Sequence, residues 1–326
     1  MLQLKRINGA GFIKQLYWLS IFLVLSANVW GQGDGPRTCL VSPKGIWGVT
    51  TKWLNMQQNF LPSGTIFVPD ASIKVNAFPL VMFYNFSIGK QFAQVIGVAA
   101  VGKTSGTIKP ANPNVPDIGF TASGFSDGLV GIKIGIIGAP ALNLAEFAAK
   151  KPAFSMMGFF RYWYSGTYNS TKAVSMGTNR STLQFSLPMS MPLGKNVSAP
   201  WWLEVHPSIE FYTANNQPPT ITGGKKITQH PIFALETHVT KNISPKVWVG
   251  TGLRYYYGGL TFLDGQSQQN LMNVLATGAI VGYQPIKAMG FNLSYGTVLS
   301  GYNNASVKMF RLAATYTHFK ASKKSE

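Results

Sequence analysis

Apolar and polar residues alternate one by one along many short segments of this chain. The clearest segment is TLQFSLPMSM at 182–191, where Leu, Phe and Met occupy every second position from Leu183 to Met191. The segments VGIKIGII at 130–137 and FNLSYGTVLS at 291–300 repeat this pattern. Successive side chains of a β-strand point to opposite faces of a sheet. Each segment is therefore predicted to be a strand with one apolar face and one face of small or polar residues.

The alternation predicts an all-β fold of about 12 strands. The predicted strands are centred near Val49, Val81, Val98, Ile132, Phe159, Phe185, Glu204, Leu235, Gly252, Ala279, Leu293 and Ala313. Their connections alternate in length: the long polar ones lie at 59–72, 109–126, 165–179 and 215–229, and the tight ones at 87–91, 192–200, 242–246 and 284–289. Outer-membrane barrels have short periplasmic turns and longer external loops. One further connection, 138–152, differs because Leu142, Leu144 and Phe147 indicate a short amphipathic helix at the periplasmic rim.

The composition separates a membrane barrel from a soluble β-sandwich, whose strands also alternate. Hydrophobic residues make up 46% of the chain and charged residues only 12%, about half the charged share of a soluble domain. After the N-terminus, no apolar run approaches the roughly 20 residues of a membrane-spanning helix. The polar faces are rich in Gly, Ser and Thr, and Tyr and Trp gather toward the segment ends. These features predict a closed antiparallel transmembrane β-barrel with an aqueous lumen.

The first residues have the pattern of a cleaved signal peptide. Basic residues from Lys5 to Lys14 precede the apolar stretch LYWLSIFLVLS at 16–26, and NVWGQ offers permissive residues for cleavage after Gly31. An uncleaved anchor helix is the alternative, but the apolar stretch is too short to span a membrane comfortably. The predicted division of the chain is a signal peptide (1–31), an N-terminal periplasmic segment (32–45), the outer-membrane β-barrel (46–319) and a basic C-terminal tail (320–326). The expected location is the outer membrane of a Gram-negative bacterium.

The strongly basic charge points to an anionic surface as neighbour. The net charge is +18, and removing the three basic residues of the signal leaves +15. We therefore expect contacts with outer-membrane lipids and lipopolysaccharide. Lys and Arg are scattered singly along an exported chain, which argues against a nucleic-acid partner. The sequence contains one cysteine, Cys39, so neither an intrachain disulfide nor a Cys-based metal cluster is expected.

The stretch WWLEVHPSIEFYT at 201–213 places ionisable residues between apolar ones. If its apolar residues face lipid, its ionisable residues face the lumen, because a charge near the midplane of the lipid face would cost a few kcal/mol. The following segment, 231–241, has the same phase, and the tight turn after it brings Arg254 diagonal to Glu236, within reach of an ion pair. The predicted lumen-facing polar patch, a candidate path for solutes or ions, comprises Glu204, His206, Glu210, Glu236, His238, Arg254, Lys133 and Arg161.

Three specific roles compete with a merely structural, solvated wall. The His and Glu side chains could hold a divalent metal, although i,i+2 spacing on a strand is a loose ligand arrangement. His206 and Ser208 resemble the His-x-Ser pair of outer-membrane phospholipases and lipid A deacylases, in which the His would act as general base for the Ser. Those enzymes attack lipid, whereas this phase points the pair into the lumen. Binding or gating by the patch is the third role, and we expect no catalysis, metal or cofactor.

Several stretches recur together in one known family. They are SGFSDGLVGIKIGIIGAPALNLAEFAAKKP (123–152), GTNRS (177–181), PLG (192–194), FYTANN (211–216) and YYYGGLTFLDGQSQ (255–268). In this combination the chain resembles the bacterial outer-membrane transporter-like proteins of the meta-pathway of phenol degradation, from about Gly124 to the last strand. The resemblance implies a barrel that passes small aromatic or hydrophobic compounds. The chain departs from the expected ending, because KASKKSE follows Phe319 in place of a terminal aromatic residue, and this bears on docking to the barrel-assembly machinery.

These observations leave two main classes of function and a third, less favoured one. The favoured class is a channel or transporter for a small-molecule solute. The second is a barrel enzyme that acts on lipid or ester substrates through His206 and Ser208. The third is a structural or adhesive outer-membrane barrel whose long loops carry the role.

Overall fold

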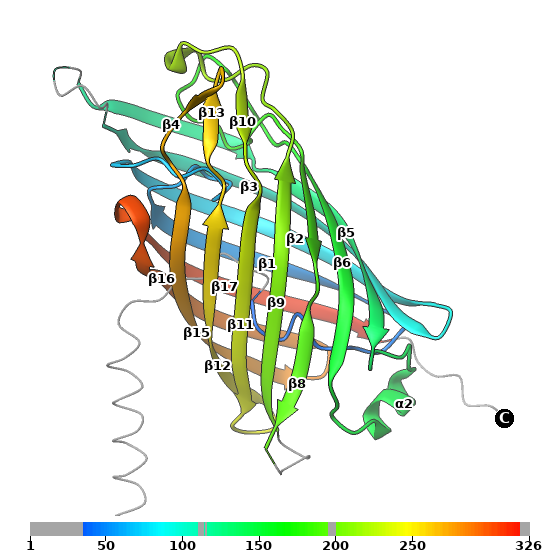
Figure 1. The fold of residues 1–326 in the computed structure, drawn as a ribbon. Helices are drawn as coiled ribbons and strands as arrows, with labels where there is room; N and C mark the ends of the chain where they lie inside the picture. The colour runs from blue at the N-terminus through cyan, green and yellow to red at the C-terminus, as the bar shows by residue number, and fades with distance from the viewer. Residues whose placement is uncertain (1–34, 110–113, 115, 195–199, 320–326) are drawn as a thin grey trace, which may run out of the picture.

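The alternating segments form one antiparallel sheet that closes on itself in the computed structural model (Figure 1). The structure describes residues 35–109, 114, 116–194 and 200–319. The barrel has 12 strand positions, and two of them are each shared by two shorter strands, β4 with β5 and β7 with β8. The barrel strands are β1 (Ile46–Gln58), β2 (Ser72–Ile88), β3 (Gln91–Ile108), β4 (Ile118–Phe125), β5 (Gly128–Ile137), β6 (Ser155–Tyr164), β7 (Thr182–Ser186), β8 (Met189–Leu193), β9 (Trp201–Tyr212), β11 (Ile232–Asn242), β12 (Val247–Gly258), β15 (Met272–Ile286), β16 (Met289–Gly301) and β17 (Val307–Phe319).

The barrel closes through β1 and β17, the first and last strands. Their antiparallel register runs from Ile46 opposite Phe319 to Gln58 opposite Val307, so both strands pair along their whole length. An open sheet would leave a row of unpaired N–H and C=O groups at each edge, and such groups are costly in hydrocarbon. Closure satisfies them, so the predicted all-β barrel is confirmed.

All of the predicted strand centres lie in strands, but two connections and one strand differ from expectation. The connection 109–126 contains β4, which continues the pairing of β3 toward the long-loop end. The connection 215–229 ends in β10 (Ile227–Gln229), which forms a small sheet with β13 (Thr261–Leu263) and β14 (Gln266–Ser267). The continuous strand expected at 182–191 is interrupted between β7 and β8, where Pro188 has no N–H to donate to a ladder.

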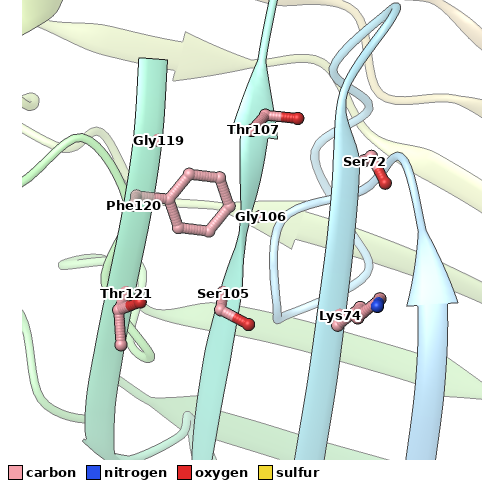
Figure 2. Close-up of a pocket in the computed structure, with 8 residues that line it drawn as sticks. All are labelled: Ser72, Lys74, Ser105, Gly106, Thr107, Gly119, Phe120 and Thr121. Carbon is pink, nitrogen blue, oxygen red and sulfur yellow. The ribbon is translucent and has the colours of Figure 1, made fainter. Parts of the chain in front are cut away.

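The outer face carries an apolar band that ends before the long loops begin. On β2, Phe78, Leu80, Met82 and Tyr84 point outward in succession and are exposed. Farther toward the long-loop end, the exposed residues of β2, β3 and β4 become polar. An open pocket lies in this region, and Figure 2 shows the residues that line it: Ser72, Lys74, Ser105, Gly106, Thr107, Gly119, Phe120 and Thr121. This change from apolar to polar is the pattern expected where a barrel wall leaves the lipid.

Aromatic side chains mark the short-turn end of the apolar band. Trp47 at the start of β1 stacks on His318 and meets Tyr316 edge to face, both on β17. Tyr84, on the other neighbouring strand, lies directly opposite Trp47. Aromatic rings with one polar atom favour the boundary between hydrocarbon and water. The Tyr and Trp residues that the sequence places toward the strand ends therefore lie at this end of the apolar band.

Inside the barrel, the largest cluster of buried apolar side chains lies toward the long-loop end. Phe60 and Phe67, in the connection between β1 and β2, are only 1% and 2% exposed. They pack with inward residues of neighbouring strands, among them Met56, Ile73, Val75, Ile232, Val274, Val307 and Met309. The loop 59–71 is therefore folded into the barrel mouth and is not a free external loop.

The rim helix expected within 138–152 is present as α2 (Leu144–Ala149), at the short-turn end (Figure 1). Asn143 and Glu146 form a capping box, in which each side chain accepts a hydrogen bond from the other residue's backbone N–H. None of the helices in the described residues is both long and apolar enough to cross a membrane. The signal peptide at 1–31 and the basic tail at 320–326 lie outside the described residues.

Candidate functional site

The polar residues of β9, β11 and β12 form one continuous patch on the inner wall. On β9, Glu204 lies opposite His238 of β11, and His206 lies opposite Glu236. Glu236 in turn lies directly opposite Arg254 of β12, and not diagonal to it as the sequence had suggested. Glu204, His206, Glu210, Glu236 and Arg254 are each exposed by 9% or less. The structure therefore brings together the side chains that the sequence predicted for these three strands. Their role in permeation stays a prediction.

Glu236 lies at the centre of this patch. His238 Nε2 is 2.6 Å from Glu236 Oε1, and Arg254 Nη1 is 3.6 Å from Glu236 Oε2. The Arg254 guanidinium also lies 4.4 Å from the centre of the Tyr256 ring. A buried carboxylate is stable only when charged or N–H groups compensate it. Here both of its oxygens have such partners.

A segment that precedes the barrel runs along this patch inside the lumen. We call residues 35–45 the N-terminal strap. The backbone N–H groups of Arg37 and Cys39 donate to the two carboxylate oxygens of Glu204, at 2.6 and 3.0 Å. The N–H of Gly35 donates to Glu236 Oε1 at 3.1 Å. Glu204 is 0% exposed, so its carboxylate has no contact with bulk water. The N–H groups of the strap take the place of that water as hydrogen-bond donors.

Cationic side chains add to the attachment of the strap. Lys133 Nζ donates to the carbonyl oxygen of Thr38 at 2.7 Å. Arg37 Nη2 donates to Asn242 Oδ1 at 2.6 Å, and its guanidinium lies 4.4 Å from the centre of the Trp248 ring. Burial lowers the pKa of the Arg37 guanidinium to about 10, so this group stays protonated at neutral pH. The sequence had suggested a periplasmic segment at 32–45; residues 35–39 instead lie in the lumen, because the inner wall supplies these partners.

The strap leaves the lumen at the short-turn rim. Asn85 Nδ2 donates to Ser42 Oγ at 2.7 Å and to the carbonyl oxygen of Pro43 at 3.1 Å. The N–H of Lys44 donates to the carbonyl oxygen of Leu142, just before α2. These contacts fix the last part of the strap before it enters β1 at Ile46. The strap is therefore anchored both at the rim and deep in the lumen.

A second group of polar side chains lies on β6, β7 and β9. The Arg161 guanidinium lies 4.2 Å from the centre of the Phe159 ring, and Arg161 Nη2 is 3.5 Å from His206 Nε2. Glu210 accepts hydrogen bonds from Gln184 Nε2 at 2.7 Å and from Tyr212 Oη at 2.5 Å. Buried polar groups of a protein interior are normally satisfied in this way. The group continues the polar wall from the strap toward the long-loop end.

A cavity of about 250 Å³ lies in the lumen between the strap and the long-loop end. One wall, from β6, β7, β9, β11, β12 and β17, carries most of the polar side chains together with a few apolar ones such as Ile232 and Met309; its polar residues include Arg161, Gln184, His206, Ser208, Glu210, Glu236, Arg254 and Arg311. The other wall, from β1, β2, β3 and the start of β5, is largely apolar and includes Leu54, Met56, Val75, Ala77, Val81, Val98, Ala100 and Leu129. The cavity is therefore two-faced, which suits a solute that has both an apolar and a polar part.

Loop and strap segments border this cavity at its two ends. Pro62, Ser63, Gly64 and Thr65 of the loop 59–71 line it at the long-loop end. Thr65 is held there by Arg180 Nη2, which donates to its hydroxyl at 2.9 Å, and by Gln229 Nε2, which donates to its carbonyl at 2.6 Å. At the other end the lining includes Glu236, which binds the strap at Gly35. In the described conformation, the lumen is therefore narrowed at both ends of the cavity.

The chemical alternatives to a channel can be compared with this geometry. His206 and Ser208 both line the cavity, so the pair faces the lumen and not the lipid that a phospholipase would attack. Among the described residues, no group of three or more His, Cys, Asp or Glu side chains is placed to hold a metal ion. Glu204 and Glu236 instead bind the strap, His238 and Arg254, and Glu210 binds Gln184 and Tyr212.

Several residues of the site did not emerge from the sequence. Arg311 is 7% exposed, and its Nε donates to Ser294 Oγ at 3.0 Å. Its inward direction could have been predicted from the sequence, because its neighbours Phe310 and Leu312 on β17 point outward. The position of the strap could not be predicted in this way, because its apolar and polar residues do not alternate. Its hydrogen-bond partners also lie on strands far along the chain. Lys52, Asp127 and Gln184 also line the cavity.

The chain is similar to solved structures and to one protein family. Its fold resembles an outer-membrane channel from Pseudomonas putida F1, with a TM-score of 0.70 at 13% identity over 88% of this chain and 100% of that chain. It also resembles the β domain of the Bordetella autotransporter BrkA, with a TM-score of 0.50 at 11% identity over 84% of this chain and 100% of that chain. At such identities the likeness concerns the fold alone.

No curated protein shows a significant sequence match to the chain. A family match is present, and it covers residues 66–306. That span includes most of the barrel strands, the loop 165–181 and the polar patch, so it represents the greater part of the chain. The protein therefore belongs to the family described as "Putative MetA-pathway of phenol degradation".

Proposed function

We propose that this protein is an outer-membrane channel that passes small aromatic or hydrophobic compounds through its lumen. The observation that carries the proposal is the two-faced cavity of about 250 Å³ inside a closed barrel. An engineered apolar cavity of about 150 Å³ is enough to bind benzene, so this space accommodates a single-ring compound. The similar outer-membrane channel supports a channel function, and the family description, which names phenol degradation, supports a single-ring solute.

The exterior of the barrel supports the location. Its apolar band and aromatic residues suit the outer membrane of a Gram-negative bacterium, with outer-membrane lipids and lipopolysaccharide as neighbours and insertion by the barrel-assembly machinery. The lumen-facing direction of His206 and Ser208 favours a channel over an enzyme that acts on lipid. We therefore propose permeation without covalent chemistry.

A cavity-filling substitution tests the proposal. Ala100 is 6% exposed and lines the apolar wall, so Ala100→Phe would place a ring inside the cavity. We expect proteoliposomes with this variant to take up single-ring compounds several-fold more slowly than the wild type. The matched control is Ala314→Phe, which adds the same ring on the opposite, outward phase of β17.

Uptake by the wild type that does not exceed that of protein-free liposomes would contradict the proposal. Equal uptake by Ala100→Phe and the wild type would show that solutes do not pass through this cavity. Folding of each variant is checked by the change in gel mobility on heating that intact barrels show.

A further inference from the structure

The outer face of the barrel carries an open pocket of about 630 Å³ on β2, β3 and β4 (Figure 2). Its lining includes the ammonium group of Lys74 and four hydroxyl groups, those of Ser72, Ser105, Thr107 and Thr121. Hydroxyl and ammonium groups donate hydrogen bonds to the oxygens of sugars and phosphates. The pocket therefore offers a polar binding surface on a barrel wall whose outward residues are otherwise mostly apolar.

Lys74 has two lysine neighbours on this outer face. Lys103 of β3 lies diagonal to it, because Lys74 is opposite Ser105, and diagonal neighbours on adjacent strands are roughly 7–8 Å apart. Lys308 of β17 lies on the other side, because Lys308 and Lys74 are both opposite Gln57 of β1. The strand spacing puts their backbones roughly 10 Å apart. All three lysines are exposed, and we call them the lysine belt.

The strands around the lysine belt carry no opposing charge. β15, β16, β17, β1, β2, β3, β4 and β5 contain neither Asp nor Glu. Asp70 and Asp117 precede the first residues of β2 and β4, on the long-loop side of the belt. Clustered charges of one sign attract a partner of the opposite sign. The belt therefore suits a partner that carries more than one negative charge.

The lysine belt lies at the edge of the apolar band. Toward the short-turn end, the next outward residues after Lys308 and Lys103 are Phe310 and Val101. Val101 is 44% exposed, and Phe310 meets the ring of Trp53 edge to face. Long loops of such barrels are external and short turns periplasmic. The belt and the pocket therefore face the headgroups of the external leaflet.

The opposite side of the barrel ends differently. At the long-loop ends of β9, β11 and β12, the outward residues are Phe211, Phe233 and Tyr257, which are 42%, 42% and 49% exposed. Apolar and aromatic surface therefore continues to the ends of these strands. The lysine belt is a feature of one side of the barrel and not a ring around it.

We propose that the pocket and the lysine belt bind the phosphorylated disaccharide headgroup of lipid A, the membrane anchor of lipopolysaccharide. The sugars occupy the hydroxyl-lined pocket, the phosphate groups meet the lysines, and the acyl chains lie along the apolar band below. The belt extends over β17, β1, β2 and β3, so a phospholipid with one phosphate would reach only part of it. The inference rests on the outer-membrane location and not on the passage of solutes.

Binding of defined lipids to the purified full-length protein tests the inference. Native mass spectrometry gives the dissociation constants of diphosphorylated lipid A, of lipid A without its phosphates and of phosphatidylglycerol. Each lysine near an anionic lipid contributes about fivefold in affinity. We therefore expect diphosphorylated lipid A to bind at least about tenfold more tightly than either of the other lipids. Excess inorganic phosphate should not displace it, because the acyl chains also bind the wall.

Substitutions locate the site on this side of the barrel. Lys74→Gln, Lys103→Gln and Lys308→Gln should each weaken binding of lipid A about fivefold, and the triple variant about a hundredfold. Ser105→Phe keeps all three lysines but places a ring in the pocket, so it should weaken binding several-fold. Folding of each variant is checked by its change in gel mobility on heating, and the single variants decide the question if the triple variant does not fold.

The matched control removes three exposed lysines from the long loops, Lys172, Lys225 and Lys226, by substitution with Gln. It lowers the net charge as much as the triple variant does, and it should keep the wild-type affinity for lipid A. An equal loss of affinity in this control would show unspecific attraction between charges and would overturn the inference.

Three other results would also overturn it: lipid A that binds no more tightly than its dephosphorylated form or phosphatidylglycerol, wild-type affinity in the triple variant or in Ser105→Phe, and displacement of lipid A by inorganic phosphate. Uptake of ring compounds is a separate measurement. The lipid site and the proposed channel can therefore fail independently of each other.

Discussion

Glu204 is the residue on which the attachment of the strap depends most. Its fully buried carboxylate accepts hydrogen bonds from the N–H groups of Arg37 and Cys39. Hydrogen bonds to a charged group contribute about 1.5–3 kcal/mol each. In Glu204→Gln one acceptor oxygen becomes an NH₂ group, so we expect the strap to bind the wall about 2 kcal/mol more weakly.

Cys39 reports this change directly. It is the sequence's one cysteine and is 2% exposed. A loss of about 2 kcal/mol corresponds to more than tenfold higher population of the released strap, so maleimide should label Cys39 at least about tenfold faster in Glu204→Gln. The control is Asp117→Asn, an equivalent change at an exposed position near β4. Similar labelling rates in Glu204→Gln and the wild type would mean that Glu204 does not hold the strap.

Leu293 tests the direction of the strand faces. It lies on the outer face of β16, opposite Leu312 of β17, and is 39% exposed. Leu293→Arg would place a charge toward the lipid hydrocarbon, and we expect it to destabilise the folded barrel by roughly 2–4 kcal/mol. The measurement is denaturant unfolding of the protein folded into lipid vesicles.

Its neighbour Ser294 provides the comparison. Ser294 points inward and accepts a hydrogen bond from Arg311, so Ser294→Ala should cost only about 1 kcal/mol. The same comparison applies on β7 and the residue after it, with outward Leu187 and inward Ser186. Equal losses at the two faces would show that the inward and outward phases are wrongly assigned.

The residues of the polar patch were predictable because lipid enforces one phase along each strand. Glu204, His206 and Glu210 alternate with apolar residues, and this fixed their direction before their partners were known. The partners were not predictable from the same pattern. The N–H groups of Gly35 and Cys39 belong to a segment without periodicity, so the role of the carboxylates as strap anchors appeared only in three dimensions.

At the scale of elements, the strap is the part of the protein most suited to regulate passage. It lies in the lumen but belongs to no strand, and its contacts are with side chains of the wall. Deletion of residues 35–41 should leave the barrel folded, because closure depends on β1 and β17. We expect unitary ion conductance to rise several-fold, since the short-turn half of the lumen becomes wider.

The control for this deletion is removal of α2, residues 144–149, with a short polar linker in its place. That helix lies at the rim and has no buried residue, so conductance should change little. A deletion of the strap that leaves conductance as it was would show that the strap does not limit the passage.

Two parts of the fold that the sequence failed to predict, β4 and the folded-in loop 59–71, were missed for different physical reasons. β4 has the sequence IGFTASGF, and part of its surface lies where the barrel wall is polar on the outside. Above the lipid, a strand needs no row of large apolar side chains, so the period-two signal fades. The loop 59–71 was missed for the opposite reason, because Phe60 and Phe67 bury their rings inside the barrel without forming a long strand.

At the scale of the whole molecule, the closed barrel wall has an outer face suited to lipid and an inner face that lines the lumen. Outside, large apolar side chains meet lipid; inside, a polar wall and an apolar wall enclose the cavity. The inner apolar wall explains why β2 carries apolar residues on both faces, with Val75, Ala77 and Val81 inward and Phe78 and Leu80 outward. A porin filled only with water would not need such an inner surface, whereas a channel for ring compounds would.

The most direct test of the channel is the ion current of the purified protein in a planar lipid bilayer, recorded with and without a single-ring solute. The structure predicts discrete unitary steps, which become larger when the strap is deleted and are interrupted when a single-ring compound such as benzyl alcohol is added. A correctly folded protein that gives no unitary steps, either intact or without residues 35–41, would contradict the account.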